Sequence, residues 1–376
     1  MVCRLDGGRG YAGDRGGAAA RGIRAAQIHL GGAGQVVTGR DYFRPLVQCG
    51  PARPDEALSL AGGWGWFSQV EVLRRGASGQ IIAAQDLPAD AAALLSAPRP
   101  QVAMLTMDRP RVMGILNTTP DSFSDGGVHA AEQDAVRAGL QMQAAGVDIL
   151  DIGGESTRPG AETVAVDEEI RRTSPVIEGL RASGVDCAIS IDTRKAAVAE
   201  NAIRAGADLV NDVSGLTYDE ALAPFCAARS LPVCVMHAQG DPETMQQDPR
   251  YDDVLLDVFD YLAGRIETLA AQGIPRSRII ADPGIGFGKT LDHNLTLLAR
   301  LSLFHDLGVP ILLGASRKRF IGTIGNAPQA DHRAPGSIAV ALAGLAHGIQ
   351  ILRVHDVPQT TQAIALWRAA MAGRQA

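Results

Sequence analysis

The sequence lacks paired cysteines, long apolar runs and any excess of positive charge. Its five cysteines are odd in number and never form a C-x-x-C pair, which argues against a disulfide framework or a structural zinc site and favours a reducing compartment. No run of about 18 apolar residues is present, and the N-terminus has no apolar segment of the kind that directs secretion. The net charge of -6 gives no reason to expect a nucleic acid partner. We therefore expect a cytoplasmic protein that binds neither membranes nor nucleic acids.

The chain has material for a large core. With 376 residues, 46% of them hydrophobic, it can form one large α/β domain plus a small addition, or two ordinary domains. Residues 1–40 are low in complexity and in large apolar side chains, so we expect them to be disordered. Residues 41–104 predict a small β-containing appendage, because residues 64–76 read as a strand that residues 80–87 could complete as a hairpin. The Ala- and Pro-rich residues 91–101 read as a linker.

From residue 111 onward, short apolar strands alternate with longer stretches of helical spacing. The strand candidates are RVMGILN, VDILDIGG, AISIDT, LVNDVSG, PVCVMH, RIIADPG, PILLGASRK and ILRVHDV. Their number and spacing match a (β/α)8 TIM barrel. An open doubly wound sheet could hold the same units, but its nucleotide-binding fingerprint is missing from the first turn. The sequence therefore predicts a barrel over residues 105–376, preceded by a small N-terminal extension.

Polar side chains stand at or near the C-terminal ends of these strands. They are Asn117, Glu155, Asp192, Asn211, His237, Asp282, Lys318, Arg353 and His355. In a barrel these strand ends share one rim, where the active site lies. We therefore expect them to form one site.

Several of these residues have a simpler explanation. Asn117, Asp121 and Asp125 in GILNTTPDSFSDGG could hold a hard cation, or they could serve the turn alone. In SIDTRK, Asp192 could be a helix N-cap. The segment ADPGIGFGKT resembles a phosphate-binding loop, but Pro283 stands where that motif requires glycine.

Two closely spaced pairs that contain basic residues predict an anion site within this acidic chain. Ser316 with Lys318, and Arg353 with His355, are spaced i, i+2, which sends both side chains of a strand to one face. Cations gathered there would bind an anionic group. A solvated basic turn could account for Lys318 and its neighbours, but it does not explain Arg353 inside an apolar strand.

The motifs together resemble the dihydropteroate synthase family. They are GILNTTPDSFSDGG, DIGGESTRPGA, SIDTRK, VNDVSG, VMH, ADPGIGFGK, ASRK and RVHDV, in the family's order and spacing over about residues 111–372. The resemblance implies condensation of 6-hydroxymethyl-7,8-dihydropterin diphosphate with 4-aminobenzoate, which gives 7,8-dihydropteroate and diphosphate in folate synthesis. It also implies Mg²⁺, a homodimer and inhibition by sulfonamides.

The resemblance assigns roles to the rim residues. Asp282, helped by Asp192 and Asn211, would accept hydrogen bonds from the aminopyrimidine edge of the pterin. Lys318 would donate to the ring carbonyl and N5, while Arg353 and His355 would bind the diphosphate. Asp192, Lys318, Arg353 and His355 would be the catalytic residues.

The resemblance also implies a metal ligand and a second pocket. Asn117 would bind Mg²⁺, with Asp121 and Asp125 as further candidates on a mobile loop. The implied aminobenzoate pocket consists of Phe123, Thr157, Arg158, Pro159 and Ser316. Two alternatives stay open at this point: a pterin-binding methyltransferase domain, which has no diphosphate to hold, and a non-catalytic homologue.

Overall fold

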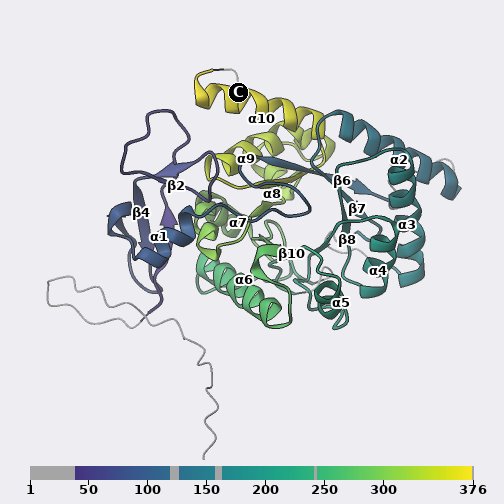
Figure 1. The fold of residues 1–376 in the computed structure, drawn as a ribbon, viewed down its shortest axis with the longest axis horizontal. Coiled ribbons are helices and arrows are strands. Elements are labelled where there is room, and N and C mark those ends of the chain that lie inside the picture. The colour runs from purple at the N-terminus through teal and green to yellow at the C-terminus, as the bar shows by residue number, and fades with distance from the viewer. Residues whose placement is uncertain (1–38, 119–126, 157–162, 241–243, 375–376) are drawn as a thin grey trace, which may run out of the picture. The chain divides into compact units, whose positions relative to one another are not determined.

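The computed structural model describes residues 39–118, 127–156, 163–240 and 244–374. Every helix and strand in these ranges belongs to one compact unit, residues 41–376 (Figure 1). None of the helices within the described ranges is long and apolar enough to cross a membrane.

Eight parallel strands form the central barrel. They are β6 (Arg111–Asn117), β7 (Ile149–Gly153), β8 (Ala188–Asp192), β9 (Leu209–Asp212), β10 (Val233–Met236), β11 (Ile279–Asp282), β12 (Leu312–Leu313) and β13 (Ile351–Val354). Their order is β11-β10-β9-β8-β7-β6-β13-β12, and a parallel bridge between Ala281 and Ile311 joins the two ends. The predicted (β/α)8 barrel is confirmed.

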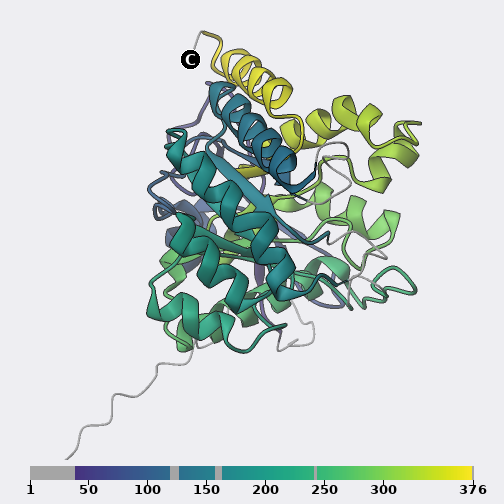
Figure 2. The same ribbon diagram turned by 90° about the vertical axis from the view of Figure 1, so that its right-hand side faces the viewer.

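Helices surround this sheet. They are α2 (Gly127–Ala144), α3 (Val166–Ala182), α4 (Ala196–Ala205), α5 (Leu222–Ala228), α6 (Val254–Ala271), α7 (Leu291–Ala299), α8 (Arg319–Ile324), α9 (Ala334–Ala346) and α10 (Val357–Ala372). Figure 2 shows α2, α3 and α4 side by side on the outside of the barrel. Local chemistry sets some helix starts: the Asp253 carboxylate caps α6, and Thr290 caps α7 in a capping box with His293.

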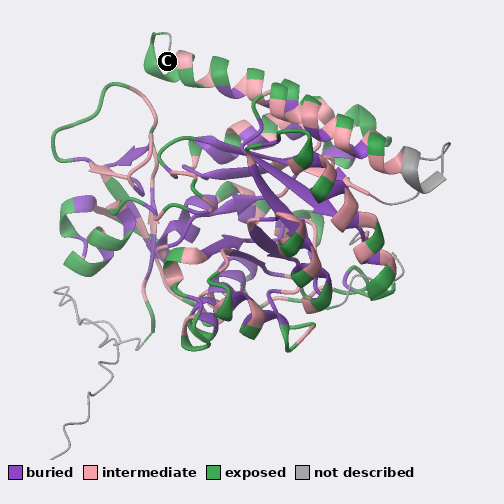
Figure 3. Ribbon diagram, turned by 45° about the vertical axis from the view of Figure 1, so that its right-hand side comes forward, coloured by how far each residue is buried: buried purple, intermediate pink, exposed green. Residues whose placement is uncertain are grey.

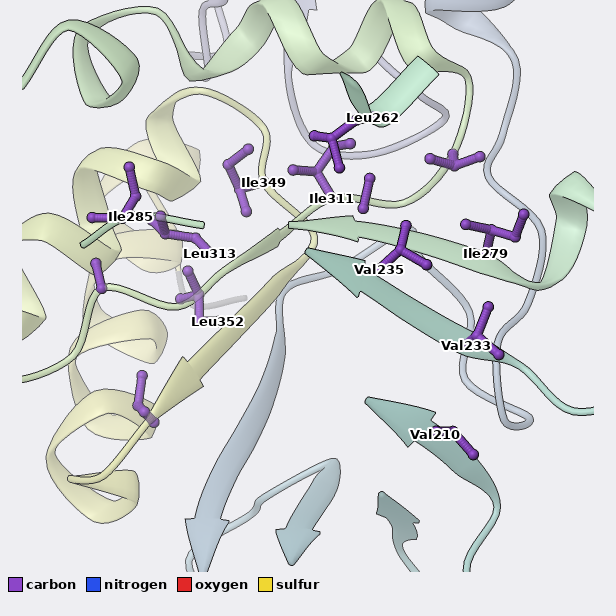
Figure 4. Close-up of a cluster of buried hydrophobic side chains, with 14 of the residues drawn as sticks. Val210, Val233, Val235, Leu262, Ile279, Ile285, Ile311, Leu313, Ile349 and Leu352 are labelled. Atoms are coloured by element: carbon purple, nitrogen blue, oxygen red, sulfur yellow. The ribbon is translucent and has the colours of Figure 1, made fainter. Parts of the chain in front are cut away.

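The strands are buried on both faces (Figure 3). Their outward side chains join side chains of the helices, such as Leu262 of α6, in one buried cluster, of which Figure 4 shows Val210 and Val233 among others. Their inward side chains fill the barrel. Because both faces are covered, the strands read in the sequence as continuous apolar runs rather than as alternating ones.

The floor of the barrel is apolar. Each strand contributes one residue to it, namely Met113, Ile149, Ala188, Leu209, Cys234, Ile280, Leu312 and Ile351. The segment that precedes β6 packs against this layer through Val102 and Met107, which are almost fully buried. The N-terminal end of the barrel is therefore closed by the chain itself.

The N-terminal extension is a small sheet with one helix. Its strands β1 (Tyr42–Pro45), β4 (Gln69–Leu73) and β5 (Gln80–Ala83) are antiparallel in the order β1-β4-β5, and β2 (Leu58–Ser59) pairs with β3 (Trp66–Phe67). The β4–β5 pair is the hairpin that the sequence suggested. A buried cluster that includes Leu60, Phe67, Val70 and Leu95 forms its core.

The prediction of a linker at residues 91–101 was wrong for the first half of this segment. Helix α1 (Ala89–Ser96) occupies it, and Ala91 and Leu95, one helical turn apart, are buried in the core of the extension. Alanine is the strongest helix former, and the prolines that looked like linker residues follow the helix end. The extension contacts the barrel helices at Tyr42, whose ring meets Phe259 of α6 edge to face at 5.4 Å.

Candidate active site

The predicted site residues occupy successive layers above the apolar floor. Two residues beyond the floor position, β7, β9, β11 and β13 present Asp151, Asn211, Asp282 and Arg353. Two residues further along β6 and β8 stand Asn117 and Asp192, and since side chains of a strand alternate between faces, these six positions share the inward parity. Ser316 and Lys318 lie beyond β12, in a turn where Arg317 has φ +57°, and His355 is the first residue after β13. The strand predicted over residues 310–318 was therefore wrong beyond Leu313, and strand parity does not place Ser316 or Lys318.

The Arg353 side chain bridges two carboxylates that stand on different strands. Its Nε donates to Oδ2 of Asp151 at 2.6 Å, and its Nη2 donates to Oδ2 of Asp192 at 2.6 Å. The Nδ2 of Asn211 lies 3.3 Å from Oδ2 of Asp151. Both carboxylates are buried, with Asp151 at 0% exposure and Asp192 at 6%. The arginine therefore balances acidic groups that could not stay charged alone.

Asp151 is a site residue that the sequence reasoning missed. It joins Arg353 to Asn211 at the centre of the polar layer. The signal was present, because Asp151 is a carboxylate inside the apolar run VDILDIGG, which is the same kind of exception that singled out Arg353.

One guanidinium facing two carboxylates leaves a surplus of negative charge. Burial raises the pKa of Asp192 to about 7, with Asp151 adding to the rise and Arg353 partly offsetting it. An unfolded Asp titrates near about 3.9. Between these two values the folded carboxyl retains a proton that the unfolded chain has released, so its contribution to stability is present at low pH and is lost as the pH rises toward about 7.

This linkage predicts a pH-dependent effect of Asp192→Asn. The free energy of unfolding of the wild type minus that of the variant should fall as the pH rises from about 5 to 7.5. Urea unfolding at a series of pH values measures it, with Asp134→Asn as the control because Asp134 is an exposed carboxylate on α2. A difference that stays constant across this range would show that Asp192 is ionised throughout.

Asp282 ends β11, and Lys318 follows β12, so both stand at the junction where the barrel closes. Burial raises the pKa of Asp282, although Oδ1 accepts a hydrogen bond from the Gly284 amide at 2.7 Å. The Nζ of Lys318 lies 3.7 Å from the centre of the Phe287 ring, which is a cation–π geometry. Burial lowers the pKa of Lys318 to about 7, and the charge of Asp282 partly offsets this effect. Phe287 is a second residue that the sequence reasoning did not select.

Glycine is required beside these groups. Gly286 has φ +83°, and a Cβ there would lie 2.9 Å from Cδ of Lys318. Gly284 has φ +68°, and a Cβ there would lie 1.9 Å from the carbonyl oxygen of His237. A side chain at either position would clash and strain the backbone. Gly284 and Gly286 of ADPGIGFGK are thus required by the shape of this loop.

Ser316 and His355 meet at the mouth of the barrel. The Nδ1 of His355 lies 3.0 Å from Oγ of Ser316, and the His355 amide donates to the same oxygen at 3.2 Å. Arg317, between Ser316 and Lys318, binds both carboxylate oxygens of Asp356 instead, at 2.5 and 3.1 Å. In this basic turn, Arg317 therefore forms a structural ion pair, whereas Ser316 and Lys318 belong to the site.

Two other rim residues hold loops. Glu155 accepts from Arg194 at 2.5 Å and from Lys195 at 2.6 Å, and Lys195 also binds Glu169 at 2.5 Å. His237 contacts the buried ammonium of Lys289 through Nδ1 at 2.8 Å. Burial and the nearby charge of Lys289 lower the pKa of His237 to about 2, so it is neutral. Sequence position alone did not separate these residues from the ones that line the site.

The remaining predicted residues fall in two segments of the sequence, 119–126 and 157–162. Phe123, Asp121 and Asp125, and Thr157, Arg158 and Pro159, lie outside the described residues. Their roles stay predictions.

The inner rim offers limited ligands for Mg²⁺. No group of three or more His, Cys, Asp or Glu side chains suited to a metal occurs within the described ranges. Oδ1 of Asn117 and Oδ2 of Asp192 lie 3.6 and 3.8 Å from the point where a Cβ on Gly153 would stand, so both oxygens border one small space. Mg²⁺ commonly keeps waters and binds through one or two protein oxygens plus substrate phosphates. The donors present fit an ion that arrives with a diphosphate.

Comparison with known proteins identifies the family. The family model described as pterin binding enzyme matches residues 113–355. The dihydropteroate synthase of Escherichia coli (strain K12) is 44% identical over 275 residues, which are 73% of this chain and 96% of that protein. The chain belongs to the dihydropteroate synthase family of pterin-binding enzymes. Residues 41–104 precede the match to the family model.

Solved dihydropteroate synthases share the fold. The Xanthomonas albilineans enzyme with 4-aminobenzoic acid superposes with a TM-score of 0.69 at 45% identity, over 73% of this chain and 98% of that chain. The Yersinia pestis enzyme in a sulfonamide drug complex gives 0.67 at 45% identity, over 71% and 96%.

Membership in the family defines the activity. The chain is a transferase of folate biosynthesis, and it condenses 6-hydroxymethyl-7,8-dihydropterin diphosphate with 4-aminobenzoate to give 7,8-dihydropteroate and diphosphate. The relatives bear the synthase name, which favours this activity over that of a methyltransferase domain.

Proposed function

We propose that the polar layers inside the barrel hold the pterin diphosphate, with Asp282 and Lys318 on the pterin ring and Arg353 and His355 on the diphosphate. The observation that carries this assignment is the placement of charged groups above an apolar floor. Asp282 and Lys318 stand at the junction of β11 and β12, and Arg353 on the adjacent strand β13 binds Asp151 and Asp192. A flat heterocycle with donors on one edge and a carbonyl on the other matches Asp282 and Lys318.

Asp282 suits the aminopyrimidine edge of the pterin. A carboxylate accepts two parallel hydrogen bonds, and the ring's N–H and NH2 lie side by side. Asn211 and Asp192, on the neighbouring strands β9 and β8, complete this part of the pocket. Lys318 donates to the ring carbonyl and N5. Its pKa, near 7, rises once an acceptor stands beside it, and this favours the charged form of the side chain.

The reaction needs no enzyme nucleophile. The C–O bond from the exocyclic CH2 to diphosphate breaks, the C–N bond to the arylamine forms, and the amine loses one proton. Electron release from the dihydropterin stabilises the carbocation-like carbon, so the protein mainly holds the leaving charge and excludes water. The Arg353 guanidinium has five N–H groups, and those beyond its bonds to Asp151 and Asp192 can donate to the diphosphate.

We also propose that Asn117 binds Mg²⁺ together with the diphosphate, with Asp121 and Asp125 as further candidates. When bound, Mg²⁺ would neutralise part of the diphosphate charge. The purified protein, given pterin diphosphate, labelled 4-aminobenzoate and Mg²⁺, should form labelled dihydropteroate, and a chelator should suppress it. In Asn117→Ala, the Mg²⁺ concentration for half-maximal rate should rise. Product formation that ignores both the chelator and the variant would refute the metal assignment.

The 4-aminobenzoate pocket is proposed at Phe123, Thr157, Arg158, Pro159 and Ser316. A sulfonamide copies the flat ring and the anionic end of the substrate but extends beyond its outline, so it should compete with 4-aminobenzoate once the pterin site is filled. Specificity is a difference between two affinities. In Phe123→Leu and Pro159→Ser, we expect the inhibition constant of the sulfonamide to rise more than the Michaelis constant for the arylamine substrate. Equal changes in both, or no change in either, would remove these residues from the pocket.

We propose a cytoplasmic homodimer in which a second copy covers α9. This helix carries no charged residue from Ala334 to Ala346, and it exposes Ala339 and Ala343 beside partly exposed Ile338 and Leu342. A helix that is apolar all round is normally buried. Light scattering should give the mass of two chains for the wild type and of one for Ala343→Arg. A monomeric wild type would refute the dimer.

A further inference from the structure

We propose that the N-terminal extension, residues 41–104, braces the seam at which the barrel closes and so positions the segment that carries Ser316 and Lys318. The importance of this segment rests on the proposed function of Lys318. The extension precedes the residues that match the family model, so its role has to be found in its contacts with the barrel.

The seam between β11 and β12 is the weakest junction of the barrel. The neighbouring pair β6–β7 stays in register from Met113 to Asn117, whereas β11 and β12 are joined only by the bridge between Ala281 and Ile311. The Ala281 amide donates across it to the carbonyl oxygen of Pro310 at 3.0 Å. This seam also carries function, because β11 ends in Asp282 and β12 leads to Ser316 and Lys318.

A long 3-10 helix precedes the weakly paired strand β12. Segment η4 (Leu301–Leu307) ends shortly before β12, and all seven of its residues are buried. Because 3-10 hydrogen bonds are poorly aligned, runs longer than three or four residues are uncommon. A seven-residue run therefore depends on contacts from outside the helix, and any shift of η4 is passed along the short connection to β12.

The extension supplies such contacts at three points. The hydroxyl of Ser302 donates to the carbonyl oxygen of Pro45 in β1 at 2.8 Å. The amide of Phe43 donates to Oδ2 of Asp306 at 3.2 Å. Nη2 of the buried Arg99 donates to the carbonyl oxygen of His305 at 2.8 Å. Each bond joins the extension to η4 rather than to the outer surface of the barrel.

Arg99 is the main link in this brace. Its Nη1 donates to the carbonyl oxygen of Leu94 at 2.8 Å, so the same guanidinium ties the end of α1 to η4. Burial lowers its pKa to about 10, which still leaves it charged at neutral pH. The extension also packs against the turn that follows η4, where a Cβ on Gly308 would lie 2.5 Å from Cδ1 of Leu94. A connector that only filled space would not need a buried cation at this position.

The test is hydrogen exchange in the full chain carrying Arg99→Met. The variant removes the guanidinium donor from the carbonyls of Leu94 and His305, and the His305 carbonyl retains the Gly308 amide. We therefore expect the amide of Ala281 and peptides over 309–318 to exchange about tenfold faster, with peptides over β6 to β8 unchanged. The KM for pterin diphosphate should rise with it. Ser302→Ala, a smaller change, should show the same pattern more weakly if Arg99→Met folds poorly.

The matched control is Arg74→Gln, which removes an ion pair with Asp41 inside the extension and touches no residue of η4. It should leave exchange at the seam unchanged. Seam exchange that stays at the wild-type rate in both test variants, or that speeds up equally everywhere, would overturn the brace. Faster exchange at the seam with unaltered kinetics would overturn its link to Lys318. An inactive wild type would instead refute the proposed function, and the exchange result would stand apart from it.

Discussion

Replacing Arg353 with methionine is expected to lower kcat/KM by about a hundredfold or more and the free energy of unfolding by about 3 to 5 kcal/mol. The variant leaves Asp151 and Asp192 buried beside each other without their shared cation. It also removes the donors proposed for the diphosphate. Steady-state kinetics and urea unfolding measure the two effects separately.

A second substitution separates charge balance from catalysis. Adding Asp192→Asn to Arg353→Met should restore part of the stability but none of the activity, because it removes the surplus charge without replacing the donors. Arg75→Met is the matched control, since Arg75 also bridges two carboxylates, Asp257 and Asp260, but at an exposed position. Exposed pairs contribute little, so stability and kcat/KM should change only slightly. Near wild-type activity in Arg353→Met would remove Arg353 from the catalytic residues.

Replacing Asp282 with asparagine is expected to weaken pterin diphosphate binding by about 1 to 3 kcal/mol, which is about 5- to 150-fold in Kd. Asparagine keeps the shape but turns one acceptor oxygen into a donor, which faces the donor edge of the pterin. Titration calorimetry with pterin diphosphate, in the absence of 4-aminobenzoate, measures the change.

The control for this prediction is a buried carboxylate on β9, which is separated from β11 by one strand. Asp212 is fully buried, but its oxygens accept from Ser214 and from the Leu216 amide at 2.7 to 2.8 Å, so it serves the turn after β9. Asp212→Asn should lower stability and leave the pterin affinity unchanged. Equal affinities in the wild type and Asp282→Asn would place the pterin elsewhere.

The sequence predicted those features that depend on local order. Strand and helix alternation predicted the barrel, and it placed Arg353 inside β13, with His355 as the first residue after that strand. It could not show that Arg353 is already bound to Asp151 and Asp192, because that contact joins residues far apart in the chain. Likewise, the burial of Ala91 and Leu95 in the core of the extension, which favours α1 where a linker was expected, depends on contacts far apart in the chain.

Residues at equivalent strand ends also differ in their roles. Glu155 and Asp282 both follow apolar strands, yet Glu155 is bound by Arg194 and Lys195, whereas Asp282 stands beside Lys318. The choice between a structural and a binding role depends on which cations the fold brings near, and no local pattern states this.

The closed N-terminal end of the barrel affects the order in which the two substrates bind. Val102 and Met107 fill the N-terminal end, so substrates and products exchange at the C-terminal end, where Ser316 and His355 lie. With the pterin at Asp282 and Asn211, as proposed, a later arrival would stand between it and solvent. On this assignment we expect the pterin diphosphate to enter first and bound 4-aminobenzoate to slow its release.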